Sequence, residues 1–337
     1  MRMKLLSSGS EMAEDKPIKV GVIGVGYLGR FHALRWKEIE SAQLVGVSDI
    51  IPERAKEVAE EAGCLAFSKN EELLEKIDAV SIVVPTPAHY SVAKTALLME
   101  KDILLEKPIT MTLEEADELI ALARQKKRIF MVGHLERFNP AVRALAEALT
   151  RPAFIEVHRL GPFQERAKDI DVVRDLMIHD LDIILSLVKA PLERVSAMGI
   201  AVLSDKLDIA NARLEFKNGT VANLTASRVS LGGGMRKIRI FQPENYISLD
   251  YQNQQMAIFT LGKEENEDPM SRIKIKNIPL NREDALRAEL RAFLESVRNR
   301  TEPPVSGEDG RRALETALMV HREISRSLEK FFSQKDG

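Results

Sequence analysis

Apolar and polar positions follow one pattern in the first half of the chain and another in the second. The first half contains short apolar runs with the length and composition of strands, at 19–24, 42–48, 78–84, 102–106 and 128–133. Helical patterns separate these runs, at 28–39, 52–62, 89–100 and 112–125. Strands that alternate with helices are typical of βαβ units. The first half is therefore expected to form a doubly wound parallel sheet of about six strands.

After residue 136 the pattern of apolar and polar positions changes. A helical pattern covers 169–189, and β-type runs between 195 and 261 are broken by turn residues such as Asn218-Gly219. These runs predict a large, mostly antiparallel open sheet. Two further helical patterns, 282–300 and 307–332, end the chain.

This layout predicts an α/β protein with two domains, and a length of 337 residues favours the same number. Residues 1–16 are interpreted as an N-terminal tail, with Met12 as an alternative start. Residues 17–136 would form the doubly wound domain, and residues 137–333 an α+β domain.

Composition narrows the classes of function. Lys plus Arg is 49 and Asp plus Glu is 51, so the net charge of −2 provides no basic field to attract nucleic acid or an anionic membrane. The one cysteine, Cys64, excludes an internal disulfide and metal sites built on paired cysteines. The chain start lacks the apolar region of a signal peptide, and no apolar stretch approaches the roughly 20 residues of a membrane span. We expect a cytoplasmic protein without nucleic-acid or membrane partners.

A glycine-rich turn marks a candidate cofactor site. Gly24-Val-Gly26-Tyr27-Leu28-Gly29 lies where an apolar strand runs into a helix. The first glycine permits a tight turn, the second lets the backbone approach a pyrophosphate, and the third lets the helix pack on its strand. Asp49 ends the second strand, where its carboxylate would accept hydrogen bonds from ribose hydroxyls and repel a 2′-phosphate. The pattern predicts NAD rather than NADP.

Two further segments follow buried strands, at the carboxyl edge where such sheets bind ligands. Pro85-Thr86-Pro-Ala-His89 is one, although a lone histidine at a helix start is more often structural. Glu106-Lys107-Pro108 is the other. A lysine acts as an acid or base when burial or a neighbouring cation shifts its pKa, and an exposed loop lysine is the alternative.

The helical pattern at 169–189 carries candidate catalytic groups. Asp175, His179 and Asp182 have i, i+4, i+7 spacing and share one face, so a carboxylate could orient the imidazole and raise its basicity. The same residues belong to a longer polar stripe, and the pattern alone favours a solvated helix face. His179 has no histidine or cysteine partner with ligand spacing, so no metal site is predicted.

Together, the glycine-rich turn, Glu106-Lys107-Pro108 and Asp175-x-x-x-His179 resemble the Gfo/Idh/MocA family of oxidoreductases, from Lys16 to the final helix. The resemblance implies an NAD-binding Rossmann domain over 17–136. It implies that 137–333 binds substrate and that its open sheet faces a partner subunit in a homo-oligomer. Lys107 and His179 would be the catalytic pair, with Asp175 as their partner and the proton acceptor undecided. The implied cofactor contacts also include Glu106, Lys107 and Asn139.

Longer segments resemble a bacterial subgroup that oxidises the 3-hydroxyl of UDP-N-acetylglucosamine. They are Gly133-His-Leu-Glu-Arg137-Phe-Asn-Pro140, His158-Arg-Leu-Gly-Pro-Phe163 and Ala222-Asn-Leu-Thr-Ala-Ser-Arg228. This resemblance implies a 3-keto sugar nucleotide that feeds a transaminase in lipid A type sugar biosynthesis. The expected substrate contacts are Lys107, Asp175, His179 and Arg137. Four arginines are available cations for the diphosphate, although charged residues of this kind more often form solvated faces: Arg159, Arg166, Arg228 and Arg236. A family dehydrogenase for another sugar or polyol and a non-catalytic NAD-binding regulator stay open as alternatives.

Overall fold

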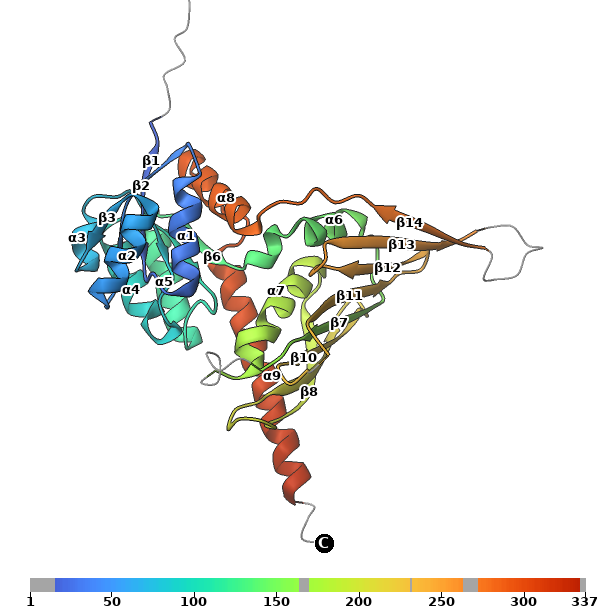
Figure 1. Ribbon diagram of the computed structural model, residues 1–337. Coiled ribbons are helices and arrows are strands. Elements are labelled where there is room, and N and C mark those ends of the chain that lie inside the picture. Colours follow the sequence, from blue (N-terminus) through green and yellow to red (C-terminus); the bar gives the residue numbers. More distant parts are fainter. Residues whose placement is uncertain (1–15, 164–169, 231, 263–271, 334–337) are drawn as a thin grey trace, which may run out of the picture.

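The computed structural model describes residues 16–163, 170–230, 232–262 and 272–333, which fold around two sheets (Figure 1). The first is a parallel sheet of six strands in the order β3-β2-β1-β4-β5-β6. Its strands are β1 (Ile18–Ile23), β2 (Ala42–Ser48), β3 (Leu65–Phe67), β4 (Ala79–Ile82), β5 (Asp102–Glu106) and β6 (Phe130–Gly133). The predicted doubly wound sheet is confirmed, and β3 is a strand that the apolar pattern missed.

Helices connect these strands and bury their apolar sides on the sheet. They are α1 (Tyr27–Lys37), α2 (Pro52–Ala62), α3 (Asn70–Leu74), α4 (Thr86–Leu98) and α5 (Leu113–Lys126). All four residues of β4 and all five of β5 are buried, as expected for parallel strands that are covered on both faces. The strand order reverses beside β1, so a crevice opens at the carboxyl ends of β1 and β4.

The second sheet has eight strands in the order β14-β13-β12-β11-β7-β10-β9-β8. Its members are β7 (Phe154–Leu160), β8 (Leu192–Ile200), β9 (Ile209–Phe216), β10 (Val221–Ser227), β11 (Met235–Phe241), β12 (Asn245–Asp250), β13 (Gln255–Leu261) and β14 (Ile273–Ile278). Every neighbouring pair is antiparallel except β7 with β10. The mostly antiparallel sheet is confirmed, but β7 and β14 lie outside the predicted span of 195–261.

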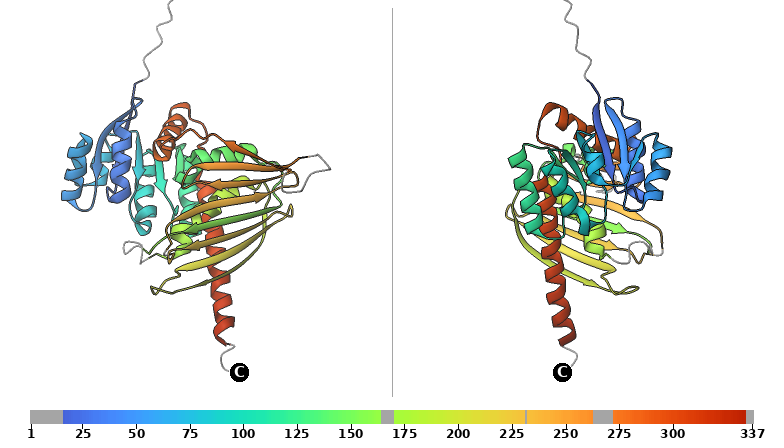
Figure 2. Two further views of the ribbon diagram at one scale, coloured as in Figure 1. Left: turned by 45° about the vertical axis from the view of Figure 1, so that its right-hand side comes forward. Right: turned by 90° about the vertical axis from the view of Figure 1, so that its left-hand side faces the viewer.

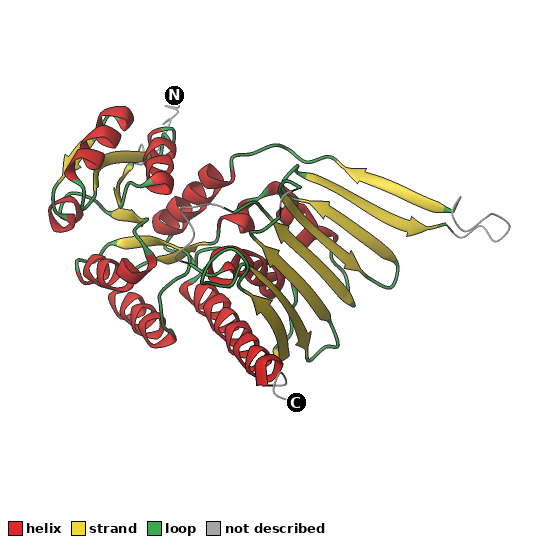
Figure 3. Cartoon of the chain, turned by 60° about the horizontal axis from the view of Figure 1, so that its bottom comes forward, coloured by secondary structure: helices red, strands yellow, loops and turns green. Residues whose placement is uncertain are grey.

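Helical segments lie against one face of this sheet, and the other face is uncovered (Figures 2 and 3). The remaining helical segments are η1 (Leu135–Phe138), α6 (Pro140–Ala148), the π-helical turn η3 (Val173–Met177), α7 (Ile178–Leu187), α8 (Ala285–Asn299) and α9 (Gly307–Ser333). The single helix expected at 169–189 is therefore η3 followed by α7. No helix in the described ranges has the length and apolar character of a membrane span.

The two hydrophobic cores do not follow the linear division at residue 136. Helix α8 packs against α1 and η1, and its Phe293 makes an edge-to-face contact with Trp36 at 6.4 Å. Leu290 and Phe293 are fully buried in the core of the first sheet. Helix α8 thus belongs to the first domain, because its apolar face finds a complementary surface there, and the predicted range 137–333 needs this correction.

Candidate active site

The glycine-rich loop between β1 and α1 forms a cradle at the helix N-terminus. Gly24 has φ +85°, and a Cβ there would lie 2.6 Å from the carbonyl oxygen of Val83. A Cβ at Gly29 would lie 1.9 Å from the carbonyl oxygen of Gly24. At Gly26 a Cβ would meet nothing within 4 Å. The first and third glycines therefore shape the turn, while the second leaves open space that fits a dinucleotide pyrophosphate. Tyr27 and Leu28 begin α1 beside this space.

Asp49 lies directly after β2 and faces the glycine-rich loop. Its Oδ2 accepts a hydrogen bond from the backbone N–H of Val25 at 2.8 Å, and its Oδ1 accepts one from Ile51 at 2.9 Å. Nη1 of Arg54 lies 3.4 Å from Oδ1. A carboxylate has about four lone-pair positions, so Asp49 retains capacity for ribose hydroxyls.

A cavity of about 1170 Å³ lies between the carboxyl edge of the first sheet and the second sheet's helices. Predicted site residues that line it are Pro85, Thr86, Lys107 and Asp175. The first three come from the ends of β4 and β5, and Asp175 comes from η3. The cavity therefore joins the candidate cofactor edge to the candidate catalytic helix.

Lys107 and Asp175 meet across this cavity. Nζ of Lys107 donates a hydrogen bond to the backbone oxygen of Asp175 at 2.8 Å and lies 3.5 Å from its Oδ1. Lys107 is only partly exposed, with 17% of its side chain accessible. The ammonium is therefore held at the cavity wall, and the structure does not give Lys107 the position of a freely exposed loop lysine.

His179 lies one helical turn after Asp175. Its Nδ1 is buried and has no hydrogen-bond partner among the described residues. Burial, followed by the positive charges of Lys107 and Arg159, holds the pKa of His179 well below its usual range. The side chain of Asp175 contacts Lys107 and makes no hydrogen bond with His179, which differs from the expected carboxylate–imidazole pair. The imidazole of His179 is therefore neutral and can accept a proton, and the Lys107 ammonium, a hydrogen-bond donor, is close enough for its charge to act on the ring.

Comparison with known proteins identifies the family. One family model, described as "Oxidoreductase family, NAD-binding Rossmann fold", matches residues 18–134, and a second, described as "GFO/IDH/MocA C-terminal domain", matches residues 148–247. The chain belongs to the Gfo/Idh/MocA oxidoreductase family. The predicted family is confirmed, and NAD is the cofactor of its first domain.

Several characterised members of the Gfo/Idh/MocA family are similar over nearly the whole chain. The UDP-N-acetylglucosamine 3-dehydrogenase of Acidithiobacillus ferrooxidans is 41% identical over 314 residues, covering 93% of this chain and 99% of that protein. A solved structure of that enzyme superposes with a TM-score of 0.87 at 42% identity, covering 91% of this chain and 97% of that one. The myo-inositol 2-dehydrogenase of Thermotoga maritima is 28% identical, covering 94% and 98%.

Other residues expected at the cofactor are engaged within the protein. The ring nitrogens of His89 lie 2.7 Å from the carbonyl oxygen of Pro108 and 2.9 Å from that of Val84, so His89 links two cavity-lining loops. Asn139 caps α6 by accepting a hydrogen bond from Ala141 N–H. His89 therefore has a supporting position beside the cavity, whereas Asn139 contacts Ala141, Glu136 and Tyr251 and is not among the residues that line it.

Glu106 is likewise engaged within the protein and is not among the residues that line the cavity. Its Oε2 accepts a hydrogen bond from the backbone N–H of Lys107 at 3.2 Å, and its Oε1 lies 3.2 Å from Nε2 of His32 on α1. The carboxylate therefore holds the backbone of the Lys107 turn. His32 was not singled out from the sequence, although its place three residues after Gly29 was a weak signal.

Most of the arginines expected at the substrate are paired with carboxylates. Arg159 is buried and pairs with Asp180 at 2.8 Å, and Arg228 is buried and pairs with Asp208 at 2.7 Å. Arg137 binds Asp182 through two hydrogen bonds. This geometry favours structural roles for these three side chains over contact with a substrate.

The two remaining arginines differ. Arg236 is about half exposed and lies 3.3 Å from Glu136. Arg166 lies outside the described residues.

The polar stripe of α7 is only partly solvated, because Asp182 is buried against Arg137 while His179 and Ser186 are half-buried. The solvated face that the pattern alone favoured is therefore wrong for Asp182.

The cavity wall carries three basic residues that the sequence did not single out, Arg174, Lys206 and His321. Arg174 immediately precedes Asp175 on η3, and its Nε is buried without a hydrogen-bond partner among the described residues. His321 on α9 lies 3.5 Å from Asp171. None of the three belongs to a recognisable motif, and only the fold brings them together.

Proposed function

We propose that this oxidoreductase oxidises the 3-hydroxyl of UDP-N-acetylglucosamine to a 3-keto sugar nucleotide. The observation that carries the proposal is 41% identity, over 93% of the chain, to a relative with that activity in its name. The cavity beside Lys107, about 1170 Å³, is somewhat larger than the usual range for small-molecule sites and can accommodate a sugar nucleotide.

The proposed roles of the chain's residues follow from their contacts. Bound NAD+ would supply the hydride acceptor. Lys107, held by Asp175, donates a hydrogen bond to the sugar hydroxyl and orients it. His179, which is neutral, accepts the hydroxyl proton as the C3 hydride leaves the sugar. Asp175 therefore acts on the lysine rather than on the imidazole.

Binding of the diphosphate is assigned to Arg174, Lys206 and His321, because all three line the cavity. Arginine suits this task since its planar fork can donate two hydrogen bonds to phosphate oxygens. We expect Arg174→Ala to raise the KM for the sugar nucleotide about tenfold or more, with a smaller effect on NAD binding. Arg322→Ala is the matched control, because Arg322 is exposed on the helix that carries His321. An unchanged KM for Arg174→Ala would contradict the assignment.

The substrate is tested by NADH formation from UDP-N-acetylglucosamine, free N-acetylglucosamine and myo-inositol. We expect NADH from the sugar nucleotide alone, because a truncated substrate lacks the remote binding energy that orients the reacting centre. Alcohol oxidation by NAD+ is uphill at neutral pH, so the assay includes a transaminase with an amino donor or a single-turnover readout. No NADH from the sugar nucleotide under these conditions, with NADH from a free sugar or polyol, would refute the substrate.

An inositol is the second candidate substrate, because a relative that is 28% identical over nearly the whole chain is named a myo-inositol 2-dehydrogenase. Turnover of myo-inositol in the same assay would favour it. A non-catalytic NAD-binding regulator is the third possibility. Loss of turnover in Lys107→Met with NAD affinity intact would exclude that role.

We further propose a cytoplasmic homo-oligomer that associates through the uncovered face of the second sheet. Four aromatic rings cross this face on adjacent strands, Phe154, Phe241, Tyr246 and Phe259, with centroids 4.9 to 5.8 Å apart. Phe241→Glu should reduce the mass measured by light scattering. Leu65→Glu, at an exposed apolar position on the first sheet, is the control and should not. An unchanged mass for Phe241→Glu would contradict this interface.

A further inference from the structure

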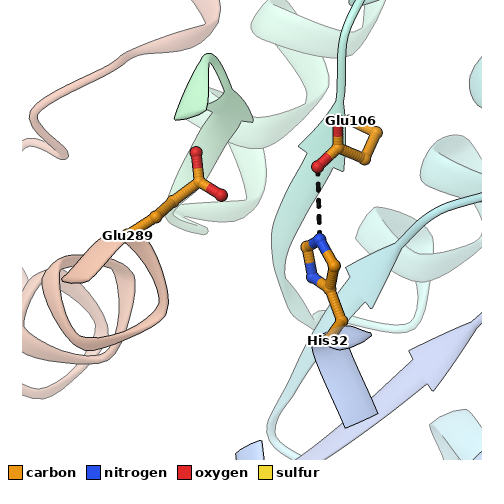
Figure 4. A group of neighbouring side chains, drawn as sticks. All are labelled: His32, Glu106 and Glu289. Atoms are coloured by element: carbon orange, nitrogen blue, oxygen red, sulfur yellow. Dashed lines mark ion pairs between the residues drawn. The ribbon is translucent and has the colours of Figure 1, made fainter. Parts of the chain in front are cut away.

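Three buried titratable side chains gather behind the Lys107 turn (Figure 4). Glu106 ends β5, His32 lies on α1, and Glu289 lies on α8. One nitrogen or oxygen atom from each lies within 4.8 Å of the others. The proposed catalytic steps use neither His32 nor Glu289, so this group calls for a separate explanation.

Glu289 is the unusual member. It is fully buried, and neither of its carboxyl oxygens has a hydrogen-bond partner in the part of the chain that the structure describes. An isolated ionised carboxylate is so costly to bury that the group takes up a proton instead. Burial, followed by the charge of Glu106, raises the pKa of Glu289 well above its usual range. Glu289 is therefore an uncharged carboxylic acid, and its O–H can donate a hydrogen bond.

Glu106 is the natural acceptor. Burial alone would raise the pKa of Glu106, but the contact with His32 and the charge of Lys107 hold it below its usual range. A Cβ at Gly133 on β6 would lie 2.8 Å from Oε1 of Glu106, so glycine at that position leaves space for the carboxylate. The group thus combines one anion with one neighbour that carries a proton.

Other contacts anchor α8 independently of Glu289. Asp284 caps the helix by accepting a hydrogen bond from Arg287 N–H at 3.0 Å. The same carboxylate accepts one from Nε of Arg35 on α1 at 2.6 Å. Phe293 packs on Trp36 in the adjoining core. Loss of the Glu289 carboxyl group should therefore leave the helix in place.

The other charged groups on the elements packed against α8 have partners of their own. On α1, Arg35 pairs with Asp284, and Glu38 lies near Arg287. The second set, on and beside η1, comprises Glu136 with Arg159, Arg137 with Asp182, and His134 at 4.0 Å from Asp182. His32, Glu106 and the nearby Lys107 are therefore the groups that determine the charge around Glu289.

We propose that Glu289 is a positioning residue that is joined to Glu106 by hydrogen bonds through one bridging water, because the two carboxyl groups lie within 4.8 Å without a direct hydrogen bond, and that it thereby fixes the turn that carries Lys107. Glu106 connects Glu289 to the turn because it also accepts a hydrogen bond from the backbone N–H of Lys107. The effect on turnover rests on the proposed catalytic role of Lys107, whereas the protonation of Glu289 does not. A divalent cation held by His32, Glu106 and Glu289 is the competing explanation.

The first experiment tests the proton. Glu289→Gln keeps a hydrogen-bond donor and removes the titration, and Glu295→Gln, at an exposed position of α8, is the control. Because folding raises the affinity of Glu289 for a proton, the wild type loses stability as pH rises above the usual pKa of glutamate. Its unfolding equilibrium constant relative to Glu289→Gln should rise tenfold per pH unit until the folded pKa is reached. If the unfolding equilibrium constants of the wild type and of Glu289→Gln depend on pH in the same way, the proposal is overturned. Glu295→Gln should show the same pH dependence as the wild type.

The second experiment tests positioning. We expect Glu289→Leu to lose about 10- to 100-fold in kcat with a smaller change in KM, and Glu289→Gln to recover most of that loss. Wild-type kcat in Glu289→Leu would overturn the positioning role. If the wild type oxidises no sugar nucleotide, the proposed function fails, and the pH titration still decides whether Glu289 is protonated. If Glu289→Leu does not fold, the pH titration of the wild type and Glu289→Gln still tests whether Glu289 is protonated.

Metal analysis distinguishes a protonated Glu289 from a divalent cation bound at this group. The purified wild type should hold no equivalent of divalent metal at this group, and EDTA should not change its melting temperature. One equivalent of Zn²⁺ or Mn²⁺ in the wild type that is absent from Glu289→Gln would overturn the proposal.

Discussion

Alanine substitutions at Gly26 and Gly29 should separate cofactor binding from folding. Gly26 has extended backbone, φ −64° and ψ −160°, and open space around its Cβ position. Gly26→Ala should therefore leave the free energy of unfolding unchanged or raise it by up to about 1 kcal/mol. The added methyl group occupies the space assigned to the pyrophosphate, so NAD affinity should fall at least about tenfold, or about 1.4 kcal/mol.

Gly29→Ala should damage the fold as well. Its Cβ would lie 1.9 Å from the carbonyl oxygen of Gly24, whereas ordinary contact begins at 3.4 Å. Overpacking of this kind costs about 1–3 kcal/mol, which lowers the melting temperature by roughly 2–4 °C per kcal/mol in domains of moderate size. Thermal denaturation and fluorescence titration with NAD measure the two effects. Wild-type NAD affinity in Gly26→Ala, or wild-type stability in Gly29→Ala, would refute the geometry of the loop.

Three further predictions concern catalysis, cofactor choice and pH. Lys107→Met and His179→Ala should each lose about 100-fold or more in turnover with NAD affinity nearly unchanged, and near-normal turnover of His179→Ala would contradict its role. NAD should bind more tightly than NADP, and Asp49→Ala should narrow the difference, so equal wild-type affinities by fluorescence titration would contradict the role of Asp49. Burial lowers the pKa of His134 and His179, so the unfolded chain binds more protons and stability should fall as pH decreases below about 6.5. A melting temperature that stays constant through this range would contradict the neutral state of these imidazoles.

Five of the six strands of the first sheet could be predicted because each of them is encoded locally, and only the short β3 was missed. Buried apolar runs and the glycine-rich turn indicated the strands around β1 without knowledge of distant residues. Strand β7 is different. Ile155 and Val157 alternate as a half-buried strand requires, but Arg159 occupies the next inward position. That arginine is buried because Asp180 neutralises it, and this partner is visible only in the fold.

The candidate site was predicted only in part, for a similar reason. Helical spacing placed Asp175 and His179 on one face, but it did not show that Asp175 would contact Lys107, 68 positions earlier. The resemblance to the family indicated Lys107 and His179, and no motif indicated Glu289, which lies 183 positions after Glu106. Contacts between distant segments are what pattern and spacing do not contain.

Helix α8 packs in the core of the first sheet although it lies near the end of the sequence, and this affects how the protein folds during synthesis. N-terminal domains generally fold first as a chain leaves the ribosome. Here α1 and the strands beside it emerge well before Ala285–Asn299, the segment that covers Trp36. The nascent NAD domain must therefore wait, with an apolar face exposed, until most of the chain has been translated. Products of premature termination, including a fragment that ends at residue 136, should consequently be prone to aggregation and to capture by chaperones.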